Sequence, residues 1–221
     1  MLATAAALLF GGSLAHSEPP KPPAFADTFT DRLAVLALIE SLNADLLASH
    51  SATRTLEAWC ADHHMAAEAK IHARRVLGAD KEISAESRRR LGIGDDTPVK
   101  YRRVELTCGD HILSQADNWY VPERLTPEMN RILETTDRPF GAVVKDLSFH
   151  RRTISMKRLW QPLAPEWELA APPADHGAQQ LGVPELLFEH RAVLEKPDGQ
   201  PFSEVVETYR RDILDFARGG F

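Results

Sequence analysis

The chain lacks the features that mark two large classes of binding protein. No glycine-rich loop follows a strand-like segment, which removes the usual nucleotide-binding fingerprints. Positive charge is also in short supply, because 32 acidic residues outnumber 26 basic ones and give a net charge of -6. Proteins that bind nucleic acids need a basic surface for the phosphates. We therefore expect neither a nucleotide cofactor nor a nucleic-acid partner.

Cysteine is scarce, with Cys60 and Cys108 the only two. They could pair in an oxidising compartment or remain buried thiols, and two cysteines form no disulfide framework, so no bridge is predicted. His63 and His64 follow Cys60, and His111 follows Cys108, at short spacing. Neither segment has the four-ligand spacing of a structural zinc site, so no metal is expected.

Long apolar runs are absent, and none approaches the roughly 20 residues needed to span a bilayer, so no permanent membrane anchor is expected. Residues 3–10 are apolar and lead to small residues ending at Ala15, which resembles a secretory signal peptide although no Lys or Arg precedes the run. Cleavage is expected after Ala15 or Ala26. We expect export to the periplasm, with the cytoplasm as the alternative.

The full sequence has 43% hydrophobic and 26% charged residues, which is the composition of a globular protein, and we expect one domain. We place a signal-like or disordered segment with a proline-rich linker at 1–26 and the domain at 27–221. Helical spacing of apolar residues predicts a helix over 30–48, and Ser51 or Thr53 begins a second. Thr126 and Pro127 begin a third, which should end before Asp137.

Strand patterns fill most of the rest. Period-two alternation predicts a strand at 67–74, and two hairpins are expected at 99–121 and 186–210. Residues 162–182 are rich in proline and alanine and are expected to be an irregular insertion. Asp146 and His150 have the i, i+4 spacing of a surface pair on a helix. Antiparallel hairpins with helices grouped between them predict an α+β fold rather than a parallel doubly wound sheet.

Several short motifs in register resemble one known family. The central hairpin motifs, at 91–93, 98–110 and 119–122, resemble the chorismate lyase superfamily, which also includes the effector-binding (UTRA) domains of GntR-type regulators. Residues 51–54, 138–141 and 199–207 continue the resemblance, which covers about residues 33 to 211. It implies an antiparallel six-stranded sheet with helices packed on it and a ligand enclosed by flaps.

The resemblance also implies an activity and a site. The family's enzyme converts chorismate to 4-hydroxybenzoate and pyruvate without metal or organic cofactor. Carried over by position, Arg103 holds the ring carboxylate together with backbone N–H groups of Ala52 and Phe140, beside Gly141. Glu207 meets the ring hydroxyl. Arg103 and Glu207 are thus the predicted catalytic residues, acting by charge-assisted hydrogen bonding and proton transfer.

Two registers stay open within this prediction. Arg102 competes with Arg103, and on a strand that shift reverses the face. Arg103 is favoured because Arg102 shares its side with Val104 and Leu106, which look like core. Glu204 is similarly an alternative to Glu207.

The expected function is therefore a carbon–oxygen lyase acting on chorismate. The alternative is a non-catalytic module of the same fold that binds a small carboxylate. In both cases the partner is a small molecule and the chain is expected to be a monomer.

Overall fold

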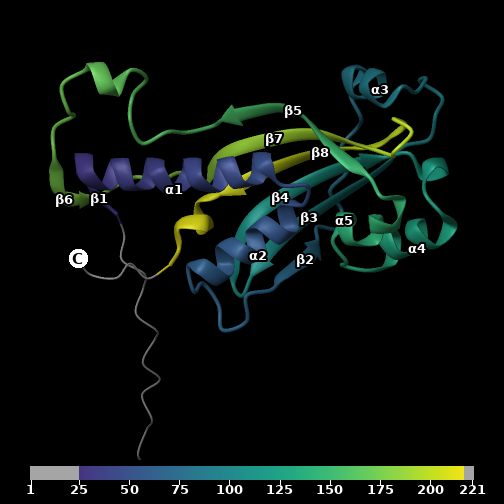
Figure 1. The fold of residues 1–221 in the computed structure, drawn as a ribbon, viewed down its shortest axis with the longest axis horizontal. Helices are drawn as coiled ribbons and strands as arrows, with labels where there is room; N and C mark the ends of the chain where they lie inside the picture. The colour runs from purple at the N-terminus through teal and green to yellow at the C-terminus, as the bar shows by residue number, and fades with distance from the viewer. Residues whose placement is uncertain (1–24, 217–221) are drawn as a thin grey trace, which may run out of the picture.

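The structure is a computed structural model that describes residues 25–216 (Figure 1). Six strands form one antiparallel sheet in the order β2-β3-β4-β8-β7-β5. Their bounds are Ile71–Arg75 (β2), Lys100–Cys108 (β3), His111–Tyr120 (β4), His150–Arg158 (β5), Leu186–Glu195 (β7) and Pro201–Arg210 (β8). The predicted α+β fold with a six-stranded antiparallel sheet is confirmed.

Both predicted hairpins are present, and glycine makes their turns. Gly109 joins β3 to β4 at φ +54°, and Gly199 precedes β8 at φ +82°. Backbone in this left-handed region carries little penalty only for a residue without a Cβ. The β3–β4 pair aligns Val104 with Ala116, and the β4–β8 pair aligns Ala116 with Glu207. This register decides which side chains share a face of the sheet.

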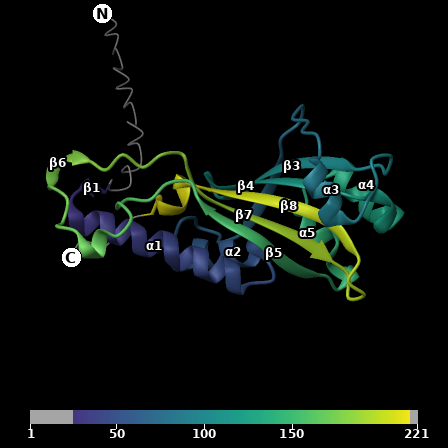
Figure 2. The ribbon, with the colours of Figure 1, turned by 90° about the horizontal axis from the view of Figure 1, so that it is seen from above.

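Two helices cover one face of the sheet, here called the helical face. They are α1 (Phe29–Ala48) and α2 (Ala52–Asp62), and Figure 2 shows both along one side of the strands. The Thr28 and Ser51 side chains cap them by accepting backbone N–H bonds. The first helix thus begins slightly earlier than expected. Leu42 and Leu56 pack in one buried cluster with Val104 and other strand residues.

The remaining helices are short and gather near the other end of the sheet (Figure 2). Their bounds are Ala85–Leu91 (α3), Pro127–Thr135 (α4) and Phe140–Val143 (α5), with 3₁₀ turns at Pro122–Arg124, Lys145–Leu147, Trp167–Leu169 and Arg211–Leu214. Leu91 of α3 packs against Val193 on the face opposite α1 and α2, here called the α3 face. Helix α3 was not predicted, because this segment carries three consecutive arginines and little apolar periodicity.

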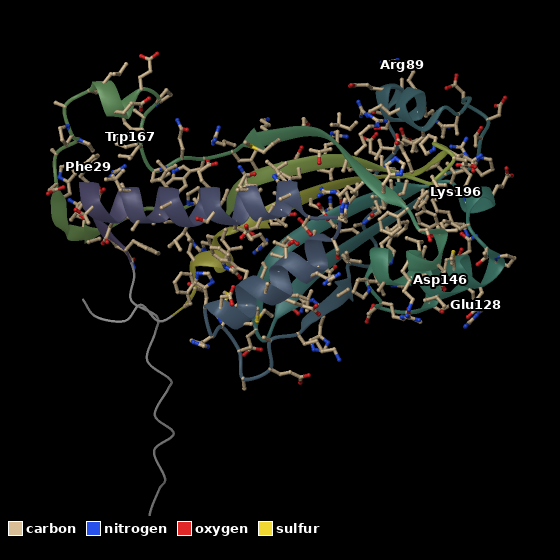
Figure 3. All side chains as sticks on the ribbon, in the orientation of Figure 1. Phe29, Arg89, Glu128, Asp146, Trp167 and Lys196 are labelled. Carbon is tan, nitrogen blue, oxygen red and sulfur yellow. A yellow bond between two sulfur atoms is a disulfide. The ribbon has the colours of Figure 1, made fainter. Side chains whose placement is uncertain are left out.

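Residues 162–182 are more ordered than predicted. Their last part forms β6 (His176–Gln180), which pairs with β1 (Ala26–Asp27). Phe29 and Trp167 pack edge to face at this end of the molecule, with ring centroids 6.0 Å apart (Figure 3). The expectation of an irregular insertion is corrected, because pairing with β1 supplies hydrogen bonds that local sequence does not reveal.

Cys60 and Cys108 form a disulfide between α2 and the end of β3. No bridge was predicted, because the sequence does not show that these elements meet. The signal-like residues and the linker lie outside the described residues, apart from Phe25, which is buried in the core, and Ala26, which belongs to β1. None of the helices within residues 25–216 combines the length and apolarity needed to cross a membrane.

Candidate functional site

A cavity of about 670 Å³ opens between the helical face of the sheet and the starts of α2 and α5. Four strands supply most of its apolar wall, and Phe140 of α5 adds an aromatic side. The strand residues are Val104, Leu106, Ala116, Val205 and Leu194. Its volume falls in the range of small-molecule pockets, about 300–1,000 Å³.

A buried ion pair lies in this cavity. Arg151 of β5 donates from Nη2 to Glu207 Oε2 at 2.6 Å, and the two side chains are 5% and 11% exposed. Tyr209 also donates its hydroxyl to Glu207 Oε2, at 3.3 Å. Within the described part of the chain, Arg151 Nε and Nη1 are buried and have no hydrogen-bond partner. The cavity thus contains a guanidinium with unused donors.

The first turn of α2 adds further donors. Ala52 and Arg54 line the cavity, while the Ser51 side chain accepts from the Arg54 N–H at 3.4 Å. The N–H groups of a helix's first turn have no partner inside the helix and lie at the positive end of its dipole. Phe140 and Gly141 also line the cavity. These backbone groups favour a negatively charged ligand.

Charge in the cavity wall is biased in the same direction. Four basic side chains line the cavity against two acidic ones, a formal excess of two positive charges; they are Arg54, Lys70, Lys145 and Arg151 against Glu57 and Glu207. Glu57 is partly engaged, because it accepts the N–H of Ile71 at 3.3 Å. An anion is therefore attracted to the cavity more strongly than a neutral molecule of the same shape.

A neutral histidine, His190, lies next to the ion pair, because it is the cross-strand partner of Glu207. His190 is fully buried, its Nε2 is 2.8 Å from Asn43 Oδ1, and its ring centroid is 5.4 Å from that of Tyr209. Burial, helped by the charge of Arg151, lowers the pKa of His190 to about 4. The imidazole is therefore uncharged at neutral pH and does not compete with Arg151 for an anion.

The structure brings together four of the five predicted site residues. Ala52, Phe140, Gly141 and Glu207 all line the cavity. Arg103 does not, because its cross-strand partner is Asp117 while Glu207 aligns with Ala116. Side chains alternate along a strand, so Arg103 and Glu207 lie on opposite faces of the sheet.

The predicted role of Arg103 is therefore corrected. Its Nε and Nη2 donate to Asp117 at 2.6 and 3.1 Å, and Tyr101 and Lys81 also donate to that carboxylate. Burial alone would raise the pKa of Asp117, but these hydrogen bonds lower it below its usual value. The prediction assigned the polar side of β3 to the pocket and the apolar side to solid core. The cavity instead opens on the apolar side.

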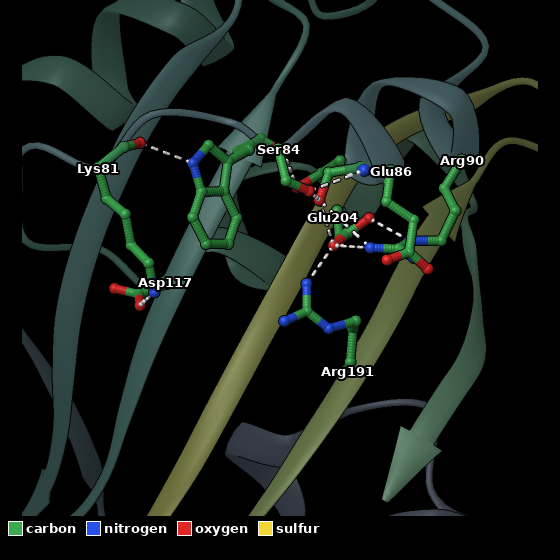
Figure 4. A network of polar contacts seen from close by, with 10 residues as sticks. Lys81, Ser84, Glu86, Arg90, Asp117, Arg191 and Glu204 are labelled. Atoms are coloured by element: carbon green, nitrogen blue, oxygen red, sulfur yellow. Dashed lines mark hydrogen bonds and ion pairs between the residues drawn. The ribbon is translucent and has the colours of Figure 1, made fainter.

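Glu204, the alternative to Glu207, also lies on the α3 face. It is fully buried and accepts from Arg90, Arg191 and Ser87 at 2.6–2.9 Å (Figure 4). Burial would raise its pKa, but these donors lower it. Within residues 25–216, none of these four residues has a buried side-chain nitrogen or oxygen atom without a partner, so this cluster holds α3 to the sheet.

Arg151 was missed because its segment gave no clear signal. The spacing of Asp146 and His150 was interpreted as helical, but His150 begins β5 and pairs with Glu195 at 3.0 Å. β5 is an edge strand with many polar residues, so its alternation is weak. Only the β-branched pair Thr153 and Ile154 could have indicated a strand.

Comparison with known proteins supports the fold and a family. No family model matches the chain. Among solved structures, PhnF from Mycobacterium smegmatis aligns with a TM-score of 0.50 and 16% identity, covering 78% of this chain and 69% of PhnF. The effector domain of PhnF gives 0.49 and 15%, covering 74% and 90%. YydK from Bacillus subtilis, described as a possible transcriptional regulator, gives 0.41 and 14%, covering 68% of this chain and 62% of YydK, under two thirds of its length.

At these identities the similarity to PhnF concerns the fold alone, so membership of the chorismate lyase family stays a prediction. A sequence relative is much more similar. The uncharacterized protein y4mC of Sinorhizobium fredii is 47% identical over 186 residues, covering 84% of this chain and 78% of y4mC. With that identity over most of both chains, this protein belongs to the family that includes y4mC.

Proposed function

We propose that this protein binds a small organic anion, a carboxylate with an apolar body, in the cavity under α2 and α5. The observation that carries the proposal is the buried Arg151 guanidinium with two nitrogen atoms lacking partners. A shared fold assigns no ligand, so the proposal rests on this cavity.

Energetics favour such a ligand. A buried donor left without an acceptor costs about 1–3 kcal/mol, and Arg151 has two such nitrogen atoms. A carboxylate would accept from them, and each charge-assisted bond contributes about 1.5–3 kcal/mol. Apolar walls would hold a ring or alkyl chain at about 25 cal/mol per Å² buried. The ligand's anionic end would therefore lie at Arg151 and its apolar body along Val104, Ala116 and Val205.

Calorimetric titration with 4-hydroxybenzoate and with its uncharged methyl ester tests the proposal. We expect saturable binding of the acid and little binding of the ester. Arg151→Met should weaken binding by at least about 10- to 100-fold, the effect of losing one of its two charged hydrogen bonds to the ligand. Arg103→Met is the matched control, because Arg103 lies on the other face, and it should bind the acid as the unaltered protein does. Equal affinity for acid and ester would contradict the proposal.

A finer proposal is that the same cavity eliminates pyruvate from chorismate to give 4-hydroxybenzoate. It is supported by the convergence of Glu207, Ala52 and Phe140 on one space. Formation of 4-hydroxybenzoate, followed by absorbance, together with an equal amount of pyruvate would support it. Glu207→Gln should then remove turnover while leaving Arg151 available for binding. Saturable binding of chorismate without formation of either product would reject the lyase activity and would be consistent with a non-catalytic binding module.

A further inference from the structure

Arg102 is a second buried arginine with unused donors. It is 6% exposed, and its Nη2 donates to the backbone oxygens of Thr136 and Arg138 at 3.3 and 2.8 Å. Within residues 25–216, its Nε and Nη1 are buried without hydrogen-bond partners. Two carbonyl acceptors hold the guanidinium in place, but they do not neutralise its charge.

Nearby carboxylates are engaged elsewhere. Glu134 pairs with Lys100, and Asp137 lies 3.8 Å from Arg75 Nε. No ion pair among the described residues includes Arg102. Burial first, and then the charge of Arg75, lower the pKa of Arg102 to about 10, so it is charged at neutral pH. A buried charge without a counter-charge is unfavourable and is usually matched by a ligand or ion.

Arg102 lines a cavity of about 330 Å³ where β2 ends. Arg75, Lys100 and Arg103 add positive charge to its wall, while Glu134 is the one acidic group among its described lining residues. Tyr120 contributes a buried phenol whose pKa is raised to about 12, chiefly by burial, so it stays a neutral hydroxyl. The wall is therefore rich in donors and in positive charge.

This cavity is separate from the one at Arg151. The two share no lining residue. Thr136 and Arg138, whose backbone oxygens accept the bonds from Arg102, come just before Pro139 and Phe140 in the wall of the larger cavity. The four basic side chains in its wall, Arg75, Lys100, Arg102 and Arg103, favour a compact and highly charged anion.

We propose that Arg102, with Arg75, Lys100 and Tyr120, forms a second binding site, for a small oxyanion of the size of phosphate. Asp137 acts on Arg102 only as a nearby charge without an ion pair, and the oxyanion would supply a counter-charge in direct contact. This site is independent of the proposed function, because neither Arg151 nor Glu207 takes part.

The test follows the Nε–H signal of Arg102 by NMR in protein labelled with ¹⁵N-arginine, assigned by its loss in Arg102→Met. Sodium phosphate, sulfate and acetate are titrated separately at constant ionic strength. We expect a saturable shift of this signal at millimolar phosphate or sulfate, retained in Arg151→Met. A shift with acetate alone would show that the site prefers carboxylates, and it would overturn the proposal of a phosphate-sized oxyanion. No saturable shift with any of the three, or loss of the shift in Arg151→Met, would overturn the site.

Affinity changes give a second readout. Arg102→Met should weaken phosphate binding about 10- to 100-fold, measured by calorimetry. Lys100→Gln alters a side chain that is 44% exposed and should weaken it about two- to fivefold without disturbing the core, which keeps the test valid if Arg102→Met does not fold. Unchanged phosphate affinity in Lys100→Gln and Arg102→Met would reject the proposal. Binding of 4-hydroxybenzoate should be unchanged in both variants, so the two proposals fail separately.

Discussion

On the α3 face, Glu204 and Asp117 each accept hydrogen bonds from several donors, whereas on the helical face Arg151 and Arg102 keep buried nitrogen atoms without partners. Both clusters therefore combine arginine with buried polar surface, but only the residues around Glu204 and Asp117 have all their buried donors paired. A cluster whose donors and acceptors match stabilises the fold. A cluster with spare buried donors is suited to a ligand, because only an added acceptor completes it.

Glu204→Ala should have the largest effect on the free energy of unfolding among the variants that test this comparison. Removing the carboxylate leaves Arg90 and Arg191 at the α3 face without their shared acceptor, and breaking a buried pair costs about 3–5 kcal/mol. We expect that loss in the free energy of unfolding in urea, with unchanged affinity for 4-hydroxybenzoate. Glu86→Ala is the control, because Glu86 is 68% exposed and contacts the same Arg90; its effect should be below about 1 kcal/mol. Altered ligand affinity in Glu204→Ala would erase the distinction between the faces.

The disulfide gives the next largest effect. Cys60 and Cys108 are 48 positions apart and tie α2, whose first turn lines the cavity, to β3. Replacing both by serine should lower the free energy of unfolding by about 2–4 kcal/mol, because the unfolded chain is no longer cross-linked. Reductant should destabilise the unaltered protein and leave the double variant unaffected. Equal sensitivity of the two proteins to reductant would show that the bridge does not form in solution.

Acid should weaken the helical face through His190. Its pKa is about 4 in the folded protein against 6.5 for an exposed histidine, so the unfolded chain binds more protons between these values. Stability is fully present above pH 6.5 and falls as the pH drops toward 4, by up to about 3 kcal/mol. His190→Gln should flatten this part of the curve of unfolding free energy against pH. The same slope in both proteins would mean that other groups cause it.

Arg103→Met should have the smallest effect. Asp117 retains hydrogen bonds from Tyr101 and Lys81, so the loss in unfolding free energy should be about 1–2 kcal/mol. Its value lies in the contrast with Arg151→Met, which should lower ligand affinity and, because it also breaks the buried pair with Glu207, the free energy of unfolding. If Arg103→Met weakened ligand binding as strongly as Arg151→Met, the placement of Arg103 away from the cavity would be wrong.

Much of the site was accessible from the sequence, but its arginine was not. Ala52, Phe140, Gly141 and Glu207 were expected together and line one cavity. Neither Arg103 nor its alternative Arg102 lines that cavity, and Arg103 was favoured because an apolar strand side was equated with solid packing. A cavity for an organic ligand is itself walled by apolar side chains, so hydrophobicity alone does not distinguish core from pocket.

The sequence by itself determined the α+β class, both hairpins and the first helices, because local periodicity, capping residues and turn glycines act over a few neighbouring positions. Only the tertiary structure decided that Cys60 meets Cys108, that β6 pairs with β1, and that Arg151 reaches Glu207. Each of those contacts joins residues 48 or more positions apart, and their register depends on how whole strands and helices pack. In the sheet, β5 pairs with β7 and not with β4, the strand of this sheet that precedes it in the chain. This pairing brings Arg151 within reach of the cavity.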